Sequence, residues 1–185
     1  MHSISRRTAA RTGSLATAAA LTLGTLGAAA PAQADTTGFR DGRAMVNKVD
    51  IWRVRVVNEK MVRVKIRHDD ITPQGSRGGS VFIDTVRSAP GPEFVFLAGL
   101  SEGTDYQIVR MENWKRKGGP MSCNIDLDLN YRTDVSHFKM TRECLDRPGR
   151  IRVAVKVGAE RGRTGTWATD WLHGRRELTR WVARG

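Results

Sequence analysis

The stretch IWRVRVVNEKMVRVKIR (residues 51–67) alternates apolar and basic side chains almost without a break. Because side chains two residues apart share one face of a strand, this period predicts an antiparallel hairpin with its turn at residues 58–60. In the predicted register Val56 lies opposite Val62, and a slip of one residue would bury the cations instead. The face predicted to pack on the core carries Trp52, Val54, Val56, Val62, Val64 and Ile66.

The other face of this hairpin carries five cations, Arg53, Arg55, Arg63, Lys65 and Arg67. Like charges directly opposite each other destabilise a pair of strands, so some compensation is expected. Two explanations are open. The acidic segment at 124–131 can lie beside the hairpin, where Asp126 and Asp128 would neutralise part of the basic face. Alternatively, the face binds an anion.

Short strand-like segments continue along the chain, at residues 80–86, 93–98, 105–112, 124–131, 136–141, 150–157 and 179–183. Gly and Pro separate them, and the only helical feature predicted is a single turn at 143–146. About eight short strands predict an all-β fold, an antiparallel β-sandwich or jelly roll. Residues 48–185 are predicted to form this single domain, whereas 35–47 and 158–177 are predicted to be irregular because Gly, Thr and charged residues dominate them.

Residues 1–34 have the three parts of a secretion signal peptide, so the mature chain is predicted to start at Asp35. Three arginines precede an apolar run at 15–30, which is too short for a good membrane span, and Ala-Gln-Ala follows at 32–34. The Arg6-Arg7 pair leaves the general secretory and the twin-arginine route both open. Removal of this segment lowers the formal charge from +12 to +9. No other long apolar stretch occurs, and therefore no membrane span is predicted.

The two cysteines, Cys123 and Cys144, are both in the exported part of the chain. An even number of cysteines outside the cell favours a disulfide over a metal site. Two thiols cannot hold zinc alone, and no histidine stands at ligand spacing from them. We therefore predict one disulfide and no metal.

No catalytic motif in the sequence is accompanied by the other features that its chemistry requires. The segment GLSEG at 99–103 fits the nucleophile-elbow pattern, but a strand-like segment follows it where that motif needs a helix. An enzyme would need His68 or His137 near a carboxylate in a pocket. Asp69, Asp70, Asp84 and Glu93 carry oxygen ligands for calcium, without the ordered spacing of a calcium loop. The chain is therefore predicted to be non-catalytic and to use no cofactor.

The most informative binding feature is the segment Trp114-Lys115-Arg116-Lys117, which precedes Gly-Gly-Pro. An indole beside three cations suits an anionic polymer or a stacked sugar ring, unless the indole folds back over the edge of the sandwich. Trp167 and Trp171 are four residues apart and leave the same choice open, a binding platform or a seal for the fold. Trp181 is predicted to pack into the core.

The order VDIWRVRVVNEKMVRVKIR, VFIDTV, GPEFVF and DYQIVRMENW resembles that of small secreted actinobacterial proteins without an assigned function. The resemblance covers most of 48–157 and the closing WVARG, and its layout is similar to carbohydrate-binding or DOMON-like β-sandwiches. It implies a sandwich fold and says little about activity. The chain departs from the pattern at Val86, where such proteins often carry an acid, and this weakens any metal role for the preceding Asp84-Thr85.

Together these features predict a secreted, monomeric binding module for an anionic or sugar-based cell-envelope polymer. The alternative is a protein-interaction module, a partner or inhibitor of an exported enzyme. No dedicated nucleic-acid site is predicted. The predicted binding residues are Trp114, Lys115, Arg116, Lys117, Arg53, Arg55, Arg63, Lys65 and Arg67.

Overall fold

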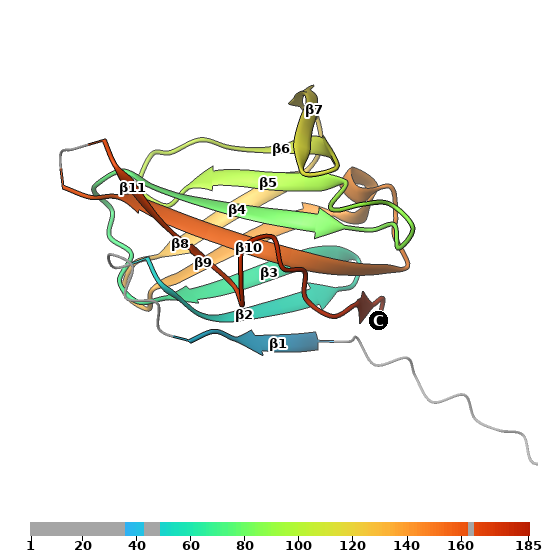
Figure 1. Cartoon of the computed structure of the whole chain (residues 1–185), viewed down its shortest axis with the longest axis horizontal. Helices are drawn as coiled ribbons and strands as arrows, with labels where there is room; N and C mark the ends of the chain where they lie inside the picture. The colour runs from blue at the N-terminus through green and yellow to red at the C-terminus, as the bar shows by residue number, and fades with distance from the viewer. Residues whose placement is uncertain (1–35, 43–48, 163–164) are drawn as a thin grey trace, which may run out of the picture. The chain divides into compact units, whose positions relative to one another are not determined.

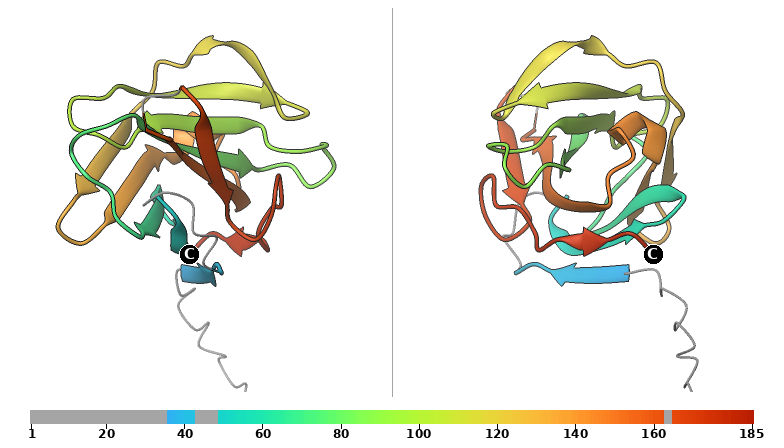
Figure 2. Two further views of the ribbon diagram at one scale, coloured as in Figure 1. Left: turned by 60° about the vertical axis from the view of Figure 1, so that its left-hand side comes forward. Right: turned by 90° about the vertical axis from the view of Figure 1, so that its right-hand side faces the viewer.

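Alternating apolar side chains build two antiparallel sheets that face each other, as Figure 1 and the turned views in Figure 2 show. This computed structural model describes residues 36–42, 49–162 and 165–185. The predicted signal peptide (1–34), its cleavage site and residues 43–48 lie outside these ranges. Within the described ranges no helix is both long and apolar enough to cross a membrane.

The first sheet has five strands in the order β1-β2-β3-β9-β8. Their bounds are β1 Thr36–Arg40, β2 Ile51–Asn58, β3 Met61–His68, β8 Ile125–Asn130 and β9 Val135–Thr141. A 3-10 turn, η1 (Arg142–Leu145), follows β9, and it confirms the single helical turn that the sequence predicts near this position.

The second sheet has seven strands, with the order β11-β10-β4-β5-β6-β7 and β12 paired to β10. Their bounds are β4 Arg77–Asp84, β5 Phe94–Gly99, β6 Tyr106–Glu112, β7 Lys115–Pro120, β10 Arg150–Glu160, β11 Trp167–Trp171 and β12 Val182–Ala183. The all-β sandwich is therefore confirmed, with twelve strands in the described residues where about eight are predicted.

The core lies between the sheets and is made of side chains at alternate positions of the strands. Val54 and Val64 come from the first sheet, and Val81, Phe96 and Val153 come from the second; all five are fully buried. Burial of each such side chain contributes about 1.5–3 kcal/mol. The strands therefore have fixed inner faces, and the residues between the core positions are left on the two outer faces.

The opening hairpin forms as predicted, but its register is wrong by two residues. Val56 pairs with Val64 instead of Val62, and Arg55 pairs with Lys65 instead of Arg63. Because side chains repeat every two residues, a shift of two keeps every valine inward and every cation outward. The faces are therefore as predicted although the pairs are not.

Trp52 is the exception on this hairpin, because the pairing of β2 with β3 shifts between Ile51 and Arg53. The irregularity places Ile51 in the core and leaves Trp52 partly exposed, with the guanidinium of Arg67 5.4 Å from the centre of its ring. The prediction that Trp52 packs in the core is wrong. The prediction for Trp181 is also wrong, since its ring is partly exposed 4.7 Å from the guanidinium of Arg152.

The acidic strand lies in the same sheet as the basic hairpin but not beside it. Strand β9 separates β3 from β8, and the carboxylate of Asp126 pairs with Lys139 of β9 at 2.9 Å. Asp128 lies opposite His137, also in β9. Direct neutralisation of the hairpin by β8 is therefore excluded, and the basic face needs another explanation.

Three strands fall where irregular structure or a loop is predicted. Strand β1 lies in the segment 35–47, β11 and the end of β10 lie in 158–177, and β7 is the segment that contains the three cations after Trp114. Every residue of β7 is exposed, so no apolar period marks it. The cations and the Gly-Gly-Pro sequence also suit an edge strand, because they discourage pairing with another chain.

The disulfide is confirmed. Cys123 and Cys144 are bonded, with their Cα atoms 5.7 Å apart, in the usual range for a disulfide. The bond joins the segment before β8 to η1, and therefore ties together two connections at the edge of the five-stranded sheet.

Two buried ionisable groups give the fold opposite responses to pH. His68 is fully buried and its Nε2 lies 2.8 Å from the hydroxyl of Ser136; burial lowers its pKa to about 4. Asp170 accepts hydrogen bonds from the backbone N–H groups of Ile51 and Trp171. Burial, aided by the nearby negative charges of Asp50 and Asp41, raises its pKa to about 6.

These shifts predict opposite pH effects for two substitutions. The lowered pKa of His68 costs stability as the pH falls from about 6.5 towards 4, whereas the raised pKa of Asp170 costs stability as the pH rises from about 4 to 6. When the pH is lowered from 7 to 4, the free energy of unfolding of His68→Gln should therefore rise relative to wild type. That of Asp170→Asn should fall relative to wild type. Each relative change is at most about 3 kcal/mol, and urea unfolding at the two pH values measures it. Relative changes of the same sign would contradict the assignment.

Candidate functional site

The structure separates the predicted binding residues into two groups on opposite outer faces of the sandwich. Trp114, Lys115, Arg116 and Lys117 belong to the β6–β7 hairpin at the edge of the seven-stranded sheet. Arg53, Arg55, Arg63, Lys65 and Arg67 lie on β2 and β3 of the five-stranded sheet. They cannot form one site, so each group is considered alone.

Trp114 folds back onto the seven-stranded sheet instead of projecting from the hairpin. Its ring lies 5.3 Å from that of Phe82, which in turn stacks on Trp171 at 5.5 Å. Asn113 and Trp114 both have positive φ, as a two-residue type I′ hairpin loop requires. A tryptophan is unusual in this conformation, and its packing on Phe82 and Trp171 holds it there. Of the two arrangements that the sequence leaves open, the structure has the indole folded back over the edge of the sandwich.

Gly91 makes room for this aromatic cluster of Phe82, Trp114 and Trp171. A Cβ atom at Gly91 would lie 2.6 Å from Nε1 of Trp114, and φ of this glycine is +84°. Both the space and the backbone conformation therefore require glycine. The outer face of this sheet has apolar side chains near β6, including Val95 and Val109. The cluster packs over them through Phe82.

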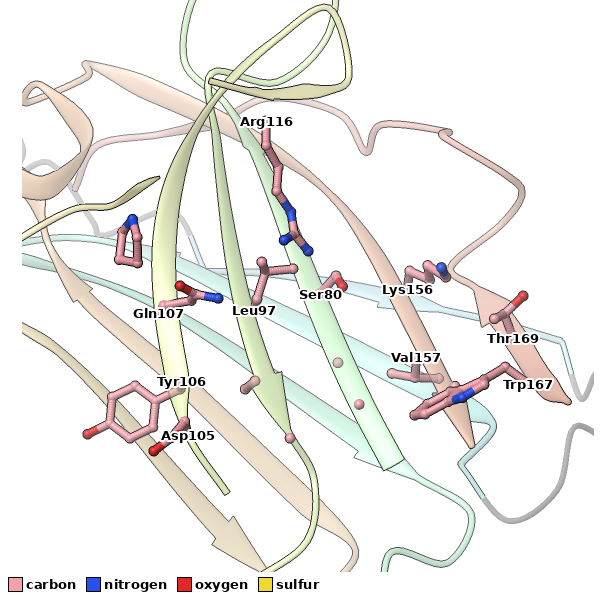
Figure 3. Close-up of a pocket in the computed structure, with 16 residues that line it drawn as sticks. Ser80, Leu97, Asp105, Tyr106, Gln107, Arg116, Lys156, Val157, Trp167 and Thr169 are labelled. Carbon is pink, nitrogen blue, oxygen red and sulfur yellow. The ribbon is translucent and has the colours of Figure 1, made fainter. Parts of the chain in front are cut away.

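The three cations of the hairpin have different surroundings. Lys117 pairs with Glu112 at 3.2 Å, and Lys115 is exposed. Arg116 points over the sheet towards Ser80, as Figure 3 shows. Of the four residues predicted here, Arg116 is the one that lines a groove.

This groove has a volume of about 660 Å³ and crosses the outer face of the seven-stranded sheet from β11 to β6 (Figure 3). Strand pairing aligns its central row, in which Lys156 of β10 lies opposite Ser80 of β4, Ser80 opposite Leu97 of β5, and Leu97 opposite Gln107 of β6. Five neighbouring strands at about 4.8 Å spacing make the groove roughly 19 Å long. An extended ligand of several units fits such a length.

Trp167 forms a flat wall at one end of the groove. Its indole lies over Gly158 and Gly78, because Cβ atoms built at these glycines would lie 3.3 Å and 3.9 Å from the ring. The glycines therefore let the ring settle against the backbone of β10 and β4. Trp167 remains 50% exposed, more than any other large apolar side chain in the described part of the chain. One face of the ring is supported and the other is open to a ligand.

Several polar side chains along the groove have no polar partner among the residues that the structure describes. In the described ranges, the side chains of Ser80, Gln107, Thr169 and Arg116 make no hydrogen bond or ion pair. Lys156 contacts only the ring of Trp171, with its Nζ 5.9 Å from the ring centre. Two hydroxyls, an amide and two cations are thus free to bind a polar ligand. Tyr106, at the far end, is 40% exposed, but its ring points away from the groove and stacks on Phe96.

A second hollow of about 430 Å³ adjoins the groove, and Lys156 and Thr169 line both. Its other residues are the aromatic cluster and two cations, Arg175 and Arg176. Asp105 is the one acidic side chain that lines either space. The combined surface is therefore polar and positive, with apolar rings at its edges.

Four of the groups considered for catalysis or metal binding are engaged within the fold. His68 is buried in the fold, and the hydroxyl of Ser101 donates to the carbonyl of Gly75. The carboxylate of Asp84 is buried against Arg152 at 2.7 Å, and that of Glu93 accepts the N–H groups of Thr85 and Val86. No three His, Cys, Asp or Glu side chains are grouped to hold a metal ion in the part of the chain that the structure describes.

Neither a scan against models of protein families nor a search of curated proteins finds a match for this chain. The groove must therefore be interpreted from its own geometry. Sequence patterns did not indicate Ser80, Gln107, Lys156 or Thr169. These residues lie on four different strands, and only the register of the strands brings them together.

The structure predicts different roles for two of the tryptophans. Trp114→Ala should lower the free energy of unfolding by about 1–3 kcal/mol, because it removes the ring that packs on Phe82 and Trp171. Trp167→Ala should change it by less than about 1 kcal/mol, because half of that side chain is exposed. Chemical unfolding of both variants measures the difference. Equal losses would mean that Trp167 is as structural as Trp114.

Proposed function

We propose that the protein is a secreted, non-catalytic module that binds a sugar polymer in the groove between Trp167 and Gln107. The observation that carries this proposal is the ring of Trp167, which is supported on one side by Gly158 and Gly78 and exposed on the other. Sugar rings have apolar faces that stack on such a plate, and their hydroxyl groups need partners at the rim. The unpaired side chains of Ser80 and Gln107 supply those partners.

The charges favour an acidic polymer over a neutral one. Arg116 and Lys156 line the groove, and Arg175 and Arg176 line the hollow beside it. Asp105 alone opposes them. Lys156 lines both the groove and the adjoining hollow. A carboxylate on a sugar unit in either of them could therefore contact this cation. A disulfide is compatible with an extracellular module of this kind.

Affinity electrophoresis of the secreted protein in gels with polygalacturonate or with neutral dextran tests the proposal. We expect retardation by polygalacturonate, and a weakening of at least ten-fold, about 1.4 kcal/mol, in Trp167→Ala. Trp181→Ala is the matched control, because it also removes a partly exposed indole beside cations but lies outside the groove. The control should bind as wild type does.

Two results would contradict the proposal. Equal binding by wild type and Trp167→Ala would show that the groove is not used. Absence of binding to both polymers, together with salt-resistant capture of one exported protein, would favour the protein-interaction module instead.

A further inference from the structure

The outer face of the five-stranded sheet carries a dense set of cations. Arg53 lies directly opposite Arg67, Arg55 lies opposite Lys65, and on the other side of β2 Arg40 of β1 lies opposite Arg53. Neighbouring strands are about 4.8 Å apart and alternate residues of one strand about 6.8 Å apart, so these cations form a tight grid. All five side chains are exposed.

The nearby carboxylates form ion pairs with cations outside this grid. Glu59 pairs with Arg63, at 2.5 Å, and Asp126 pairs with Lys139, at 2.9 Å. In the described ranges no carboxylate lies within ion-pair distance of Arg53, Arg55 or Lys65. Like charges directly opposite each other on paired strands oppose folding. The fold therefore tolerates repulsion on this face that no ion pair with a described acid offsets.

The grid lines two hollows, not a flat surface. Arg53, Arg55, Lys65 and Arg67 share a hollow of about 540 Å³ with Arg132 and Asp134. The carboxylate of Asp134 accepts the N–H of Ile71 at 3.1 Å, so it is partly engaged. Arg53 and Arg55 also line a hollow of about 350 Å³ on the side of β1, together with Arg40. The two hollows form a positive track across β1, β2 and β3.

The track affects a neighbouring titratable group. Burial is the main cause that lowers the pKa of His137, and the positive charge of Lys65 lowers it further, while Asp128 acts in the opposite direction. Lys139 of the same strand also lowers it. The positive potential of the track therefore extends to β9, where it favours a neutral imidazole.

We propose that this track is a second binding site, which takes a linear polymer of polyol or sugar units joined by phosphodiester groups. Guanidinium groups donate paired hydrogen bonds to phosphate oxygens, and three of the four grid residues on β2 and β3 are arginine. Successive phosphates along the chain would each meet one row of cations. The track lies on the opposite face from the groove, so one molecule would link two different polymers.

The same face disfavours the other polyanions. A single-stranded nucleic acid binds most firmly where its bases stack on aromatic rings. An acidic sugar chain also gains affinity when its rings stack on an aromatic side chain. The aromatic ring beside the grid is that of Trp52, and the guanidinium of Arg67 lies over it. A phosphate-linked chain needs no stacking platform, because its contacts are made by charge and by hydrogen bonds.

Titration of the protein with inorganic polyphosphate of about twenty units, across a salt series, tests this site. Arg53→Gln/Arg67→Gln should weaken binding at least ten-fold and make it less sensitive to salt. The melting temperature of this variant without ligand should equal or exceed that of wild type, because a repulsive pair is removed. Lys115→Gln/Arg150→Gln, which removes the same charge from outside the track, is the matched control and should bind nearly as wild type does.

Three outcomes would overturn the proposal. Equal weakening in the two double variants would show attraction by net charge alone. Equal affinity for polygalacturonate at the track, measured in the Trp167→Ala background, would show that phosphate is not selected. Absence of binding at low salt would remove the site. Because Trp167→Ala should leave polyphosphate binding unchanged, failure of the track and failure of the groove are distinguishable.

Discussion

Burial of one face of each sheet determines which side chains point inward and which are left on the outer faces. Every strand of the core places alternate apolar residues between the layers, as Val54 and Val81 do from opposite sheets. The side chains at the positions between them must then point outward, whatever their chemistry. The outer faces are therefore free to carry groups without a polar partner in the described residues, such as Ser80, or groups that oppose folding, such as the paired Arg53 and Arg67. The two proposed binding surfaces consist of side chains that the core does not use.

Sequence patterns predicted the features that depend on local periodicity. Apart from Trp52, the alternation in 51–67 indicated which side chains face the core, and an error of two residues in the hairpin register left those faces unchanged. The disulfide followed from cysteine count and compartment. Strand β7 was missed because all of its residues are exposed, and no apolar period can mark such a strand. Trp52 was misplaced because a local irregularity in pairing has no signal in an alternating pattern.

The candidate groove could not be predicted, for a different reason. Its residues come mainly from β11, β10, β4, β5, β6 and β7, and they meet only because non-local pairing aligns Lys156, Ser80 and Gln107 in one row. The glycines were a usable signal, since glycine inside a strand often marks close approach of another group. Gly78 and Gly158 lie opposite each other and admit the indole of Trp167. The strand order must be known before these two glycines can be related to the indole of Trp167.

The proposed function depends most on contact between the exposed face of Trp167 and a sugar ring. Two-dimensional ¹H–¹⁵N NMR spectra of the protein, recorded during titration with an oligogalacturonate, test that contact directly. The indole N–H signal of Trp167 should shift most among the five tryptophans, together with the amide signals of Ser80 and Gly158. The amide signals of β2 and β3 should shift little. Shifts centred on β2 and β3, or an unchanged indole signal of Trp167 at saturation, would contradict the account.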